Sequence, residues 1–303
     1  MQNDLLTVEE ITLGELKEIF RLAAKMKRER SKSKDRPLAG KSVGMIFSKS
    51  STRTRVSFEV GITELGGFPL FLDQNDLQLG RGESIPDTAR VLSRYLHAVV
   101  IRTFKHEDIV EFAKYANIPV INALTDMYHP CQILTDLFTI YEYSEHLEGI
   151  KIAFMGDCAC NTANSLILAA KLAGMNLVLS SPKKYRPDQD LLDYDSIGNG
   201  TVSWEEDPYA AVENADYIYT DVWVSMGFEE EAKQRMQKLK PYAVNADLVD
   251  NASKDVRIMH CLPAHRGEEI TDEVMDSHAS IVFDQAENRL HVQKAILTML
   301  LKD

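Results

Sequence analysis

The chain has 303 residues, enough for about two ordinary domains, each with a core of its own. Its hydrophobic share of 45% and charged share of 26% are typical of a globular protein, and no apolar run is long enough for a membrane-spanning helix. With 34 Lys and Arg against 46 Asp and Glu, the formal charge of −12 argues against a nucleic-acid partner. An anionic small molecule would need a local cluster of arginines.

The N-terminus and the cysteines favour a cytoplasmic protein. The first residues, MQNDLLTVEE, lack the basic start and apolar stretch of a signal peptide. The four cysteines do not have the spacing of a disulfide framework, and no second pair lies near Cys158 and Cys160 at zinc spacing. We therefore expect reduced thiols, no metal and no cofactor.

The first half of the chain alternates helical stretches with short β-rich runs, the pattern of an α/β domain with a parallel sheet. Its predicted helices are residues 13–30, 52–67, 85–95 and 106–116, and its predicted strands are 41–47, 68–73, 97–103 and 118–123. A long helix from Pro130 to about His146 then leads into a second α/β unit.

The second half repeats the alternation. Its predicted strands are residues 150–156, 176–181, 201–204, 217–221, 256–260 and 280–283, and its predicted helices are 162–174, 207–215 and 286–301. The sequence thus predicts two doubly wound parallel-sheet domains joined by long helices, with the C-terminal helix packing back on the first domain. We expect one domain of residues 1–147 with 285–303 and another of 148–284, with the cleft between them as the ligand site.

A phosphate site is predicted at residues 51–55, Ser-Thr-Arg-Thr-Arg, directly between a strand and a helix. A helix N-terminus offers free N–H groups and a partial positive charge, and arginines bind phosphate through paired hydrogen bonds. No Walker-type glycine-rich loop with a lysine is present, which argues against a nucleoside triphosphate. The alternative is that the hydroxyls only cap the helix.

Two further groups follow predicted strands of the first domain. Arg102 lies near the end of one strand, and His129 and Gln132, in the motif HPCQ, come after another. Ligands of open parallel sheets bind beyond the carboxyl ends of the strands. His and Gln can donate hydrogen bonds to a carbonyl or phosphoryl oxygen, so this position favours a binding role.

The second domain carries DVWVSMG at 221–227 and HCLP at 260–263, each after a predicted strand. Asp221 at a strand end is suited to a cationic group, although an Asp that only caps a turn is an equally good explanation. Cys261 could be a nucleophile or a polarisable contact, but no partner for a cysteine-protease mechanism is identifiable. Arg289 follows in the last helix.

Taken together, STRTR, HPCQ, DVWVSMG and HCLP resemble, in order and spacing, the motifs of the aspartate/ornithine carbamoyltransferase family. The resemblance covers essentially the whole chain, extends to LQLGRGES and FDQAENR, and is greatest to the members that use ornithine. It implies transfer of the carbamoyl group of carbamoyl phosphate to the side-chain amine of L-ornithine, which gives citrulline and phosphate. It also implies a homotrimer or a multiple of trimers, with Gln78 in a loop that enters the neighbouring subunit's site.

The resemblance assigns each motif a role. The carbamoyl-phosphate residues would be Ser51, Thr52, Arg53, Thr54, Gln78, Arg102, His129, Gln132, Cys261, Leu262 and Arg289. The ornithine residues would be Asn161, Asp221, Ser225 and Met226. The catalytic residues would be Arg102, His129, Asp221 and Cys261.

Some alternatives remain open from the sequence. The family commonly has paired Asn after Gly-Asp, and this chain has Cys160 before Asn161, so only Asn161 is carried over. Related enzymes carbamoylate putrescine or N-acetylornithine, but the intact Ser-Met-Gly favours ornithine. A nicotinamide-dependent dehydrogenase would need Gly-x-Gly-x-x-Gly, which is absent after the strand at 150–156. The sequence does not distinguish arginine synthesis from citrulline breakdown.

Overall fold

The computed structural model describes residues 3–30, 32–49, 51–73, 82–195, 198–224 and 231–302. By its internal contacts the chain divides into unit 1, Met1–Phe138 with Glu287–Asp303, and unit 2, Thr139–Ala286. The division falls inside two helices, whereas the sequence places the boundaries near 148 and 285. Each unit is a separate α/β structure.

Unit 1 is built on a four-stranded parallel sheet in the order β2-β1-β3-β4. Its strands are β1 (Ser42–Phe47), β2 (Phe68–Asp73), β3 (Ala98–Arg102) and β4 (Val120–Leu124). Its helices are α1 (Leu13–Arg28), α2 (Thr52–Glu64), α3 (Ile85–Leu92), α4 (His106–Tyr115), the start of α5 (Pro130–Ser144) and most of α12 (Val282–Leu301).

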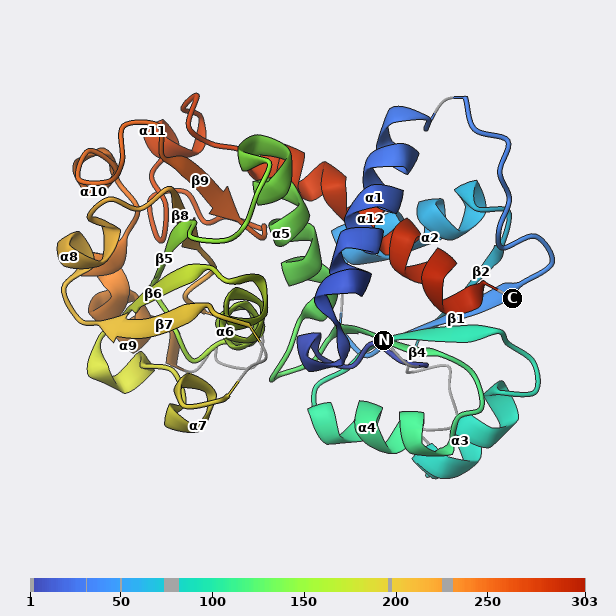
Figure 1. Cartoon of the computed structure of the whole chain (residues 1–303). Coiled ribbons are helices and arrows are strands. Elements are labelled where there is room, and N and C mark those ends of the chain that lie inside the picture. The colour runs from blue at the N-terminus through green and yellow to red at the C-terminus, as the bar shows by residue number, and fades with distance from the viewer. Residues whose placement is uncertain are drawn as a thin grey trace. The chain divides into compact units, whose positions relative to one another are not determined.

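Helices cover both faces of this sheet. Figure 1 shows α1, α2 and α12 on one face and α3 and α4 on the other. On the second face, Ile109 and Phe112 of α4 pack with Val99 and Ile101 of β3 in one apolar cluster. Every residue of β3 is buried, as expected for a central parallel strand.

Unit 2 contains a five-stranded parallel sheet in the order β7-β6-β5-β8-β9. Its strands are β5 (Lys151–Met155), β6 (Asn176–Ser180), β7 (Thr201–Glu205), β8 (Tyr217–Thr220) and β9 (Arg257–His260). Its helices are α6 (Asn161–Ala173), α7 (Gln189–Leu192), α8 (Pro208–Val212), α9 (Ala232–Leu239), α10 (Ala246–Val249) and α11 (Asp272–Met275).

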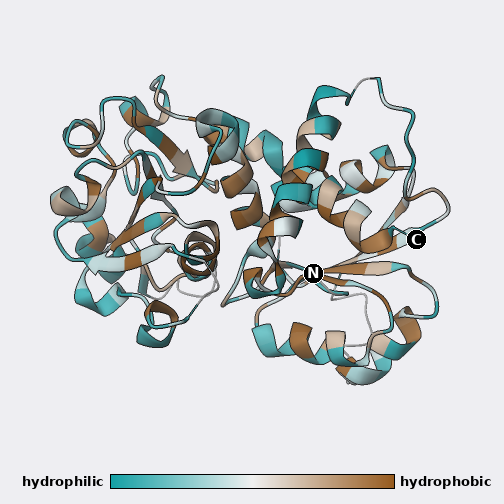
Figure 2. Cartoon of the chain, viewed as in Figure 1, coloured by the Kyte–Doolittle hydropathy of each residue, from teal (hydrophilic) through white to brown (hydrophobic). Residues whose placement is uncertain are grey.

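The helix α6 is apolar around most of its circumference, and it appears mainly brown in Figure 2. All of its residues after Asn161 are buried. The side chain of Cys160 caps its first turn by accepting a hydrogen bond from the N–H of Ala163, and Gly174 ends it in the left-handed conformation. A buried helix directly after β5 fixes the position of its N-terminus, where Asn161 and Thr162 lie.

The structure confirms the predicted fold class and corrects some of its elements. The strand predicted at residues 280–283 is wrong: Ser280 forms an isolated bridge with Ile258, and α12 already begins at Val282. A short apolar run cannot be assigned to strand or buried helix by periodicity alone, and Val282 is fully buried. The helix α9 was not predicted, because its sequence AKQRMQKL carries few apolar residues.

No helix in the described part of the chain is both long enough and apolar enough to cross a membrane. Of the four cysteines, none forms a disulfide, and three are buried.

Candidate functional site

In unit 1, the predicted residues lie at the carboxyl ends of the strands, around the point where the strand order reverses. The first strand, β1, lies between β2 and β3, so connections leave its two sides toward opposite edges of the sheet. Ligands of doubly wound sheets bind at such a switch point, beyond the carboxyl ends of the strands. Ser51 follows β1, Arg102 ends β3 and His129 follows β4.

The N-terminus of α2 forms a cradle of donors. Ser51 is the N-cap, and its Oγ accepts a hydrogen bond of 3.3 Å from the N–H of Thr54. Thr52 is exposed, Arg53 is half-buried and Thr54 is buried on the first turn. Helix capping therefore accounts for the Ser51 hydroxyl. The backbone N–H groups of the first turn, two threonine hydroxyls and the Arg53 guanidinium are the other hydrogen-bond donors at this helix end.

Arg289 reaches this region from α12. Its Nη2 donates to Oγ1 of Thr54 at 2.7 Å, and its Nη1 donates to Oε1 of Gln132 at 2.7 Å. The Nε2 of Gln132 donates in turn to Oδ1 of Asp136 at 2.8 Å. This buried series of hydrogen bonds fixes the orientation of the Gln132 amide and holds the Arg289 charge beside α2.

His129 is kept neutral by its surroundings. Its side chain is buried, which lowers its pKa well below the ordinary value of 6.5, and the charges of Arg289 and Arg102 lower it further. Arg102 is also buried. Unit 1 therefore brings together two buried guanidiniums and one neutral imidazole, a set that suits a phosphate and a polarised carbonyl oxygen.

In unit 2 the corresponding switch point lies between β5 and β8. Asp221 directly follows β8 and is 9% exposed. Its Oδ2 accepts from the hydroxyl of Thr162 at 2.8 Å, and its Oδ1 accepts from the N–H of Val222 at 2.7 Å and the thiol of Cys261 at 2.8 Å. All three donors are neutral, and in the described residues Asp221 forms no ion pair.

A buried ion pair supports the loop that carries Asp221. Arg235 donates to Oδ2 of Asp157 at 2.5 Å and to the carbonyl oxygen of Trp223 at 3.3 Å. Burial raises the pKa of Asp157, and Arg235 opposes this rise. Gly156 has φ +117°, and a Cβ there would come within 3.0 Å of the Trp223 ring. Only glycine is therefore suited to the position where β5 meets this loop.

The structure separates the predicted residues into three groups. Unit 1 assembles Ser51, Thr52, Arg53, Thr54, Arg102, His129, Gln132 and Arg289. Unit 2 assembles Asp221 and Cys261, with Asn161 beginning α6 and Leu262 following Cys261. Gln78, Ser225 and Met226 lie outside the described residues.

Arg55, the second arginine of STRTR, has a different environment from Arg53. Its Nε lies 3.0 Å from Oε1 of Glu59, and its guanidinium stacks 3.6 Å from the centre of the Phe71 ring. The side chain is thus engaged on the surface of unit 1. Of the two arginines in the predicted phosphate motif, Arg53 is therefore better suited to bind phosphate than Arg55.

Sequence reasoning missed Thr162 and Asp136. Thr162 binds the Asp221 carboxylate, and Asp136 binds the Gln132 amide. The available signals were weak: Thr162 follows Asn161 at a helix start, and Asp136 lies four residues after Gln132 on the same helical face. Thr162 does not stand out because its partner, Asp221, follows a different strand. Asp136 does not stand out because its bond to Gln132 matters only once this part of the helix is buried.

Asp221, His260 and Cys261 place three possible metal-ligand atoms within 4.8 Å of one another. Each already has a partner: Cys261 donates to Asp221, and Nδ1 of His260 accepts from the N–H of Leu262 at 2.9 Å. A second group contains His265, Glu268 and Glu269. We assign a metal to neither group.

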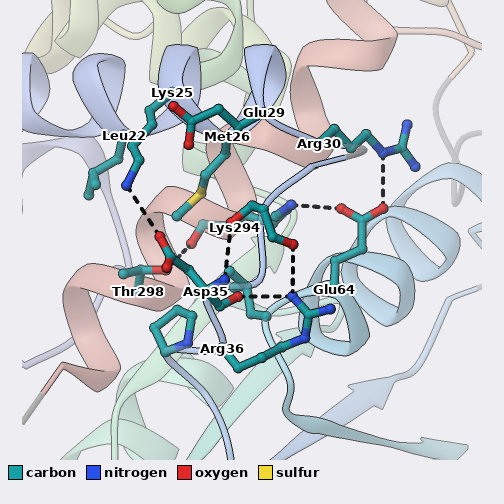
Figure 3. Close-up of a pocket in the computed structure, with 13 residues that line it drawn as sticks. Leu22, Lys25, Met26, Glu29, Arg30, Asp35, Arg36, Glu64, Lys294 and Thr298 are labelled. Atoms are coloured by element: carbon teal, nitrogen blue, oxygen red, sulfur yellow. Dashed lines mark hydrogen bonds and ion pairs between the residues drawn. The ribbon is translucent and has the colours of Figure 1, made fainter.

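Unit 1 also contains a cavity of about 520 Å³ between α1, α2 and α12 (Figure 3). Glu64 lines this cavity and forms two ion pairs across it. Its Oε1 lies 2.9 Å from Nε of Arg30, and its Oε2 lies 2.6 Å from Nζ of Lys294. None of the described site residues lines it. Glu64 ends α2, whereas the phosphate cradle begins it, so about 18 Å of helix separates the two. The Lys294 ion pair joins α12 to α2, and the Arg30 ion pair joins the segment after α1 to α2.

Comparison with protein families matches both units. The carbamoyl-P binding domain of aspartate/ornithine carbamoyltransferase matches residues 3–142, and the Asp/Orn binding domain of the same family matches residues 148–300.

Individual relatives match over nearly the full chain. Proteins named ornithine carbamoyltransferase from Methanoculleus marisnigri and Syntrophus aciditrophicus are 52% and 53% identical, over 99% of this chain and 97% and 100% of theirs. The solved ornithine carbamoyltransferase of Pyrococcus furiosus is 48% identical, with a TM-score of 0.93 over 97% of this chain and 96% of that one. The Thermus thermophilus structure of that name is 38% identical, with a TM-score of 0.91 over the full length of both chains.

Proposed function

The chain belongs to the aspartate/ornithine carbamoyltransferase family, and we propose that it transfers the carbamoyl group of carbamoyl phosphate to the side-chain amine of ornithine. The products are citrulline and phosphate. The identity of about half of all residues with full-length relatives named for this activity supports the reaction. The chemistry of the two half-sites supports the assignment of each substrate to a unit.

Unit 1 is the half for carbamoyl phosphate. The N-terminus of α2, with Thr52, Arg53 and Thr54, supplies hydrogen-bond donors for the phosphate. Arg102 and Arg289 neutralise charge that develops on the carbonyl oxygen and the leaving phosphate. His129 acts as a neutral donor, since its lowered pKa leaves it uncharged near pH 7.

Unit 2 is the half for the amine, and the observation that carries this assignment is the Asp221 carboxylate. Its partners are a hydroxyl, a thiol and a backbone N–H, so its negative charge is not neutralised by a cation of the described chain. A second carboxylate would be repelled here, which disfavours aspartate as the acceptor. An amine is attracted.

The proton of the amine has to leave during the reaction. An alkyl amine has a pKa of about 10.4, and a nearby carboxylate favours its charged form. In our proposal the ammonium first loses one proton to solvent. The lone pair of the neutral nitrogen then forms a bond to the carbamoyl carbon, the bond from that carbon to the phosphate oxygen breaks, and the nitrogen gives its second proton to the departing phosphate. The oxygen that leaves the carbamoyl carbon receives the electron pair of the broken bond, so it is a suitable base for this proton.

Assembly and location are part of the same proposal. The family resemblance supports a homotrimer in the cytoplasm, acting in arginine metabolism, with Gln78 reaching a neighbouring subunit. Gln78 lies outside the described residues, so its role remains a prediction. Light scattering of the purified protein should give about three times the chain mass of 34.2 kDa or a multiple of that value, and a single-chain mass would contradict the trimer.

The acceptor is tested with a panel of amines. Initial rates with carbamoyl phosphate and ornithine, putrescine, N-acetylornithine or aspartate are measured by mass spectrometry of the products. We expect kcat/KM for ornithine to exceed the others by about 10² or more, because a site with matched polar groups rejects ligands that leave them unpaired. A higher value for another amine would overturn the ornithine assignment.

The phosphate half is tested by two neighbouring arginines. Arg53→Ala should lower kcat/KM for carbamoyl phosphate by about 10²–10³, the usual loss for one donor to a developing charge. Arg55→Ala is the matched control, because this side chain already pairs with Glu59, and it should change the rate by about threefold or less. Equal effects of the two substitutions would contradict the assigned cradle.

A further inference from the structure

The carboxylate of Asp221 accepts three hydrogen bonds, which are divided unevenly between its two oxygens. Its Oδ1 accepts from the N–H of Val222 at 2.7 Å and from the thiol of Cys261 at 2.8 Å. Its Oδ2 accepts from the hydroxyl of Thr162 at 2.8 Å. An ionised carboxylate has about four lone-pair positions, two on each oxygen. In the described part of the chain, both positions of Oδ1 are therefore occupied, and one position remains on Oδ2.

Thr162 is well placed to be a fixed donor. It is the second residue of α6 and is 1% exposed, and its β-branched side chain has few rotamers on a helix. Its Oγ1 also lies 3.4 Å from Oδ1 of Asn161. The hydroxyl has one proton, and the shorter contact, to the charged oxygen of Asp221, is the stronger of the two. The hydroxyl therefore donates to Asp221.

The donors hold the carboxylate from different sides of its strand. Cys261 follows β9, Thr162 lies on the helix that follows β5, and these two strands flank β8, which Asp221 follows. The bond from Thr162 is the one that fixes Oδ2, whereas the other two both end on Oδ1. Without the Thr162 hydroxyl the carboxylate is freer to turn about its Cβ–Cγ bond, because this torsion has a broad energy minimum.

We propose that Thr162 is a positioning residue for the amine of the substrate: its hydroxyl orients the Asp221 carboxylate and leaves one acceptor position on Oδ2 for an N–H of the amine. This inference rests on the proposed function and deepens it, because it identifies the oxygen that the amine contacts. The amine donates one N–H to this oxygen, since the hydroxyl takes the neighbouring position. The orientation of the carboxylate itself does not depend on any substrate.

Two substitutions of Thr162 separate its hydroxyl from its shape. Thr162→Val keeps the branched shape and removes the donor to Oδ2, whereas Thr162→Ser keeps the donor and removes a methyl group. We expect Thr162→Val to lower kcat/KM for ornithine by about tenfold or more, the usual effect of losing one hydrogen bond to a charged group. Thr162→Ser should lower it by about threefold or less. Steady-state kinetics at saturating carbamoyl phosphate measures both.

The second substrate shows whether the effect is only structural. In both variants the KM for carbamoyl phosphate should change by about threefold or less, because that half-site lies in unit 1. A merely structural role of Thr162 would affect both substrates. It would also make Thr162→Ser at least as damaging as Thr162→Val, since only the serine leaves a methyl-sized cavity. Either of these results would contradict the positioning role.

A double-mutant cycle tests whether Thr162 acts through Asp221. In the Asp221→Ala background, Thr162→Val should change kcat/KM for ornithine by about threefold or less, because the hydrogen bond that it removes is already absent. A loss of about tenfold in both backgrounds would show that the hydroxyl acts independently of the carboxylate, and the proposal would be wrong.

Thr201→Val is the matched control, because it makes the same change in the same unit. Thr201 lies on β7, at the edge of the sheet, and its hydroxyl donates to Oδ1 of Asn176 at 2.7 Å. We expect this variant to have the kcat/KM of the native enzyme within about twofold. A tenfold loss here would mean that any hydroxyl of unit 2 produces the effect, which would overturn the assignment to Thr162.

Crystal structures without substrate separate this inference from the proposed function. The Asp221 carboxylate should keep its orientation in Thr162→Ser and turn, or adopt two orientations, in Thr162→Val. The native orientation in Thr162→Val would overturn the positioning role. If the carboxylate turns as expected while the native enzyme fails to carbamoylate ornithine, the positioning of Asp221 by Thr162 stands and the proposed function fails.

Discussion

The two half-sites present opposite charges at the carboxyl ends of two parallel sheets, each of which contains a switch point. Unit 1 gathers the guanidiniums of Arg102 and Arg289 around a neutral His129, and unit 2 holds the single carboxylate of Asp221 with neutral donors. In both units the residues lie at the carboxyl ends of strands that flank a switch point or are next to those that do. Topology therefore provides the place, and the side chains alone decide whether an anion or an amine is attracted there.

The half-sites also differ in how their residues are connected along the chain. In unit 1, Arg289 and Thr54 are separated by 235 residues, and the C-terminal helix has to return to α2 for the bond to form. In unit 2, Asp221 and Cys261 are 40 residues apart, at the ends of the neighbouring strands β8 and β9. The geometry of the cationic half-site in unit 1 therefore depends on the packing of α12 against α2, whereas the bond between Asp221 and Cys261 in unit 2 does not involve α12.

The largest expected effect is at Arg289. Arg289→Ala should lower kcat/KM for carbamoyl phosphate by about 10³, because it removes a donor and leaves Gln132 and Thr54 without a shared partner. Arg289→Lys should recover only about tenfold of this loss, since an ammonium cannot reproduce the planar fork. Steady-state kinetics after a check of the circular dichroism spectrum measures both.

Arg21→Ala on α1 is the control for these variants, because Arg21 is exposed and pairs only with Glu18 in the described contacts. We expect its rate to equal that of the native enzyme. Full activity of Arg289→Lys would show that a positive charge at this position is enough for carbamoyl phosphate binding. The paired hydrogen bonds of Arg289 to Gln132 and Thr54 would then not be required.

A smaller effect is expected at Asp221, and it should be selective. Asp221→Asn keeps the shape but loses the charge, so kcat/KM for ornithine should fall by about 10², while the KM for carbamoyl phosphate changes by about threefold or less. Asp276→Asn, at an exposed ion pair with Arg266, is the control. Equal losses for both substrates would contradict the division of labour between the two half-sites.

The smallest expected effect is on stability, through His129. Its pKa in the folded protein lies well below 6.5, so the unfolded chain takes up the proton first as the pH falls. Stability from this group is present above pH 6.5 and is lost as the pH falls below it, by about 1 kcal/mol between pH 6.5 and 5.5. Urea unfolding of the native protein and of His129→Gln at both pH values measures the difference.

The native protein should lose more stability than His129→Gln over that interval. Burial also lowers the pKa values of His106 and His291, but both are present in the two proteins, so their contributions cancel in the comparison. Identical pH dependence of the two proteins would mean that burial and the cations of unit 1 do not lower the pKa of His129 as inferred.

The sequence alone determined the alternation of strands and helices, because the periodicity of apolar residues reflects which side of each element is buried. It also placed Arg102, His129, Asp221 and Cys261 at or after the ends of strands, and the order of the motifs indicated the family. These features are local, or depend only on order along the chain, so one sequence is enough to recognise them.

Only the tertiary structure decided which side chains meet. The bonds of Arg289 to Gln132 and Thr54, of Thr162 to Asp221 and of Glu269 to His260 depend on the packing of whole elements. The same packing begins α12 at Val282, where the sequence predicted a strand. Burial makes each polar group require a partner, and the sequence pattern shows that requirement without showing which distant residue fulfils it.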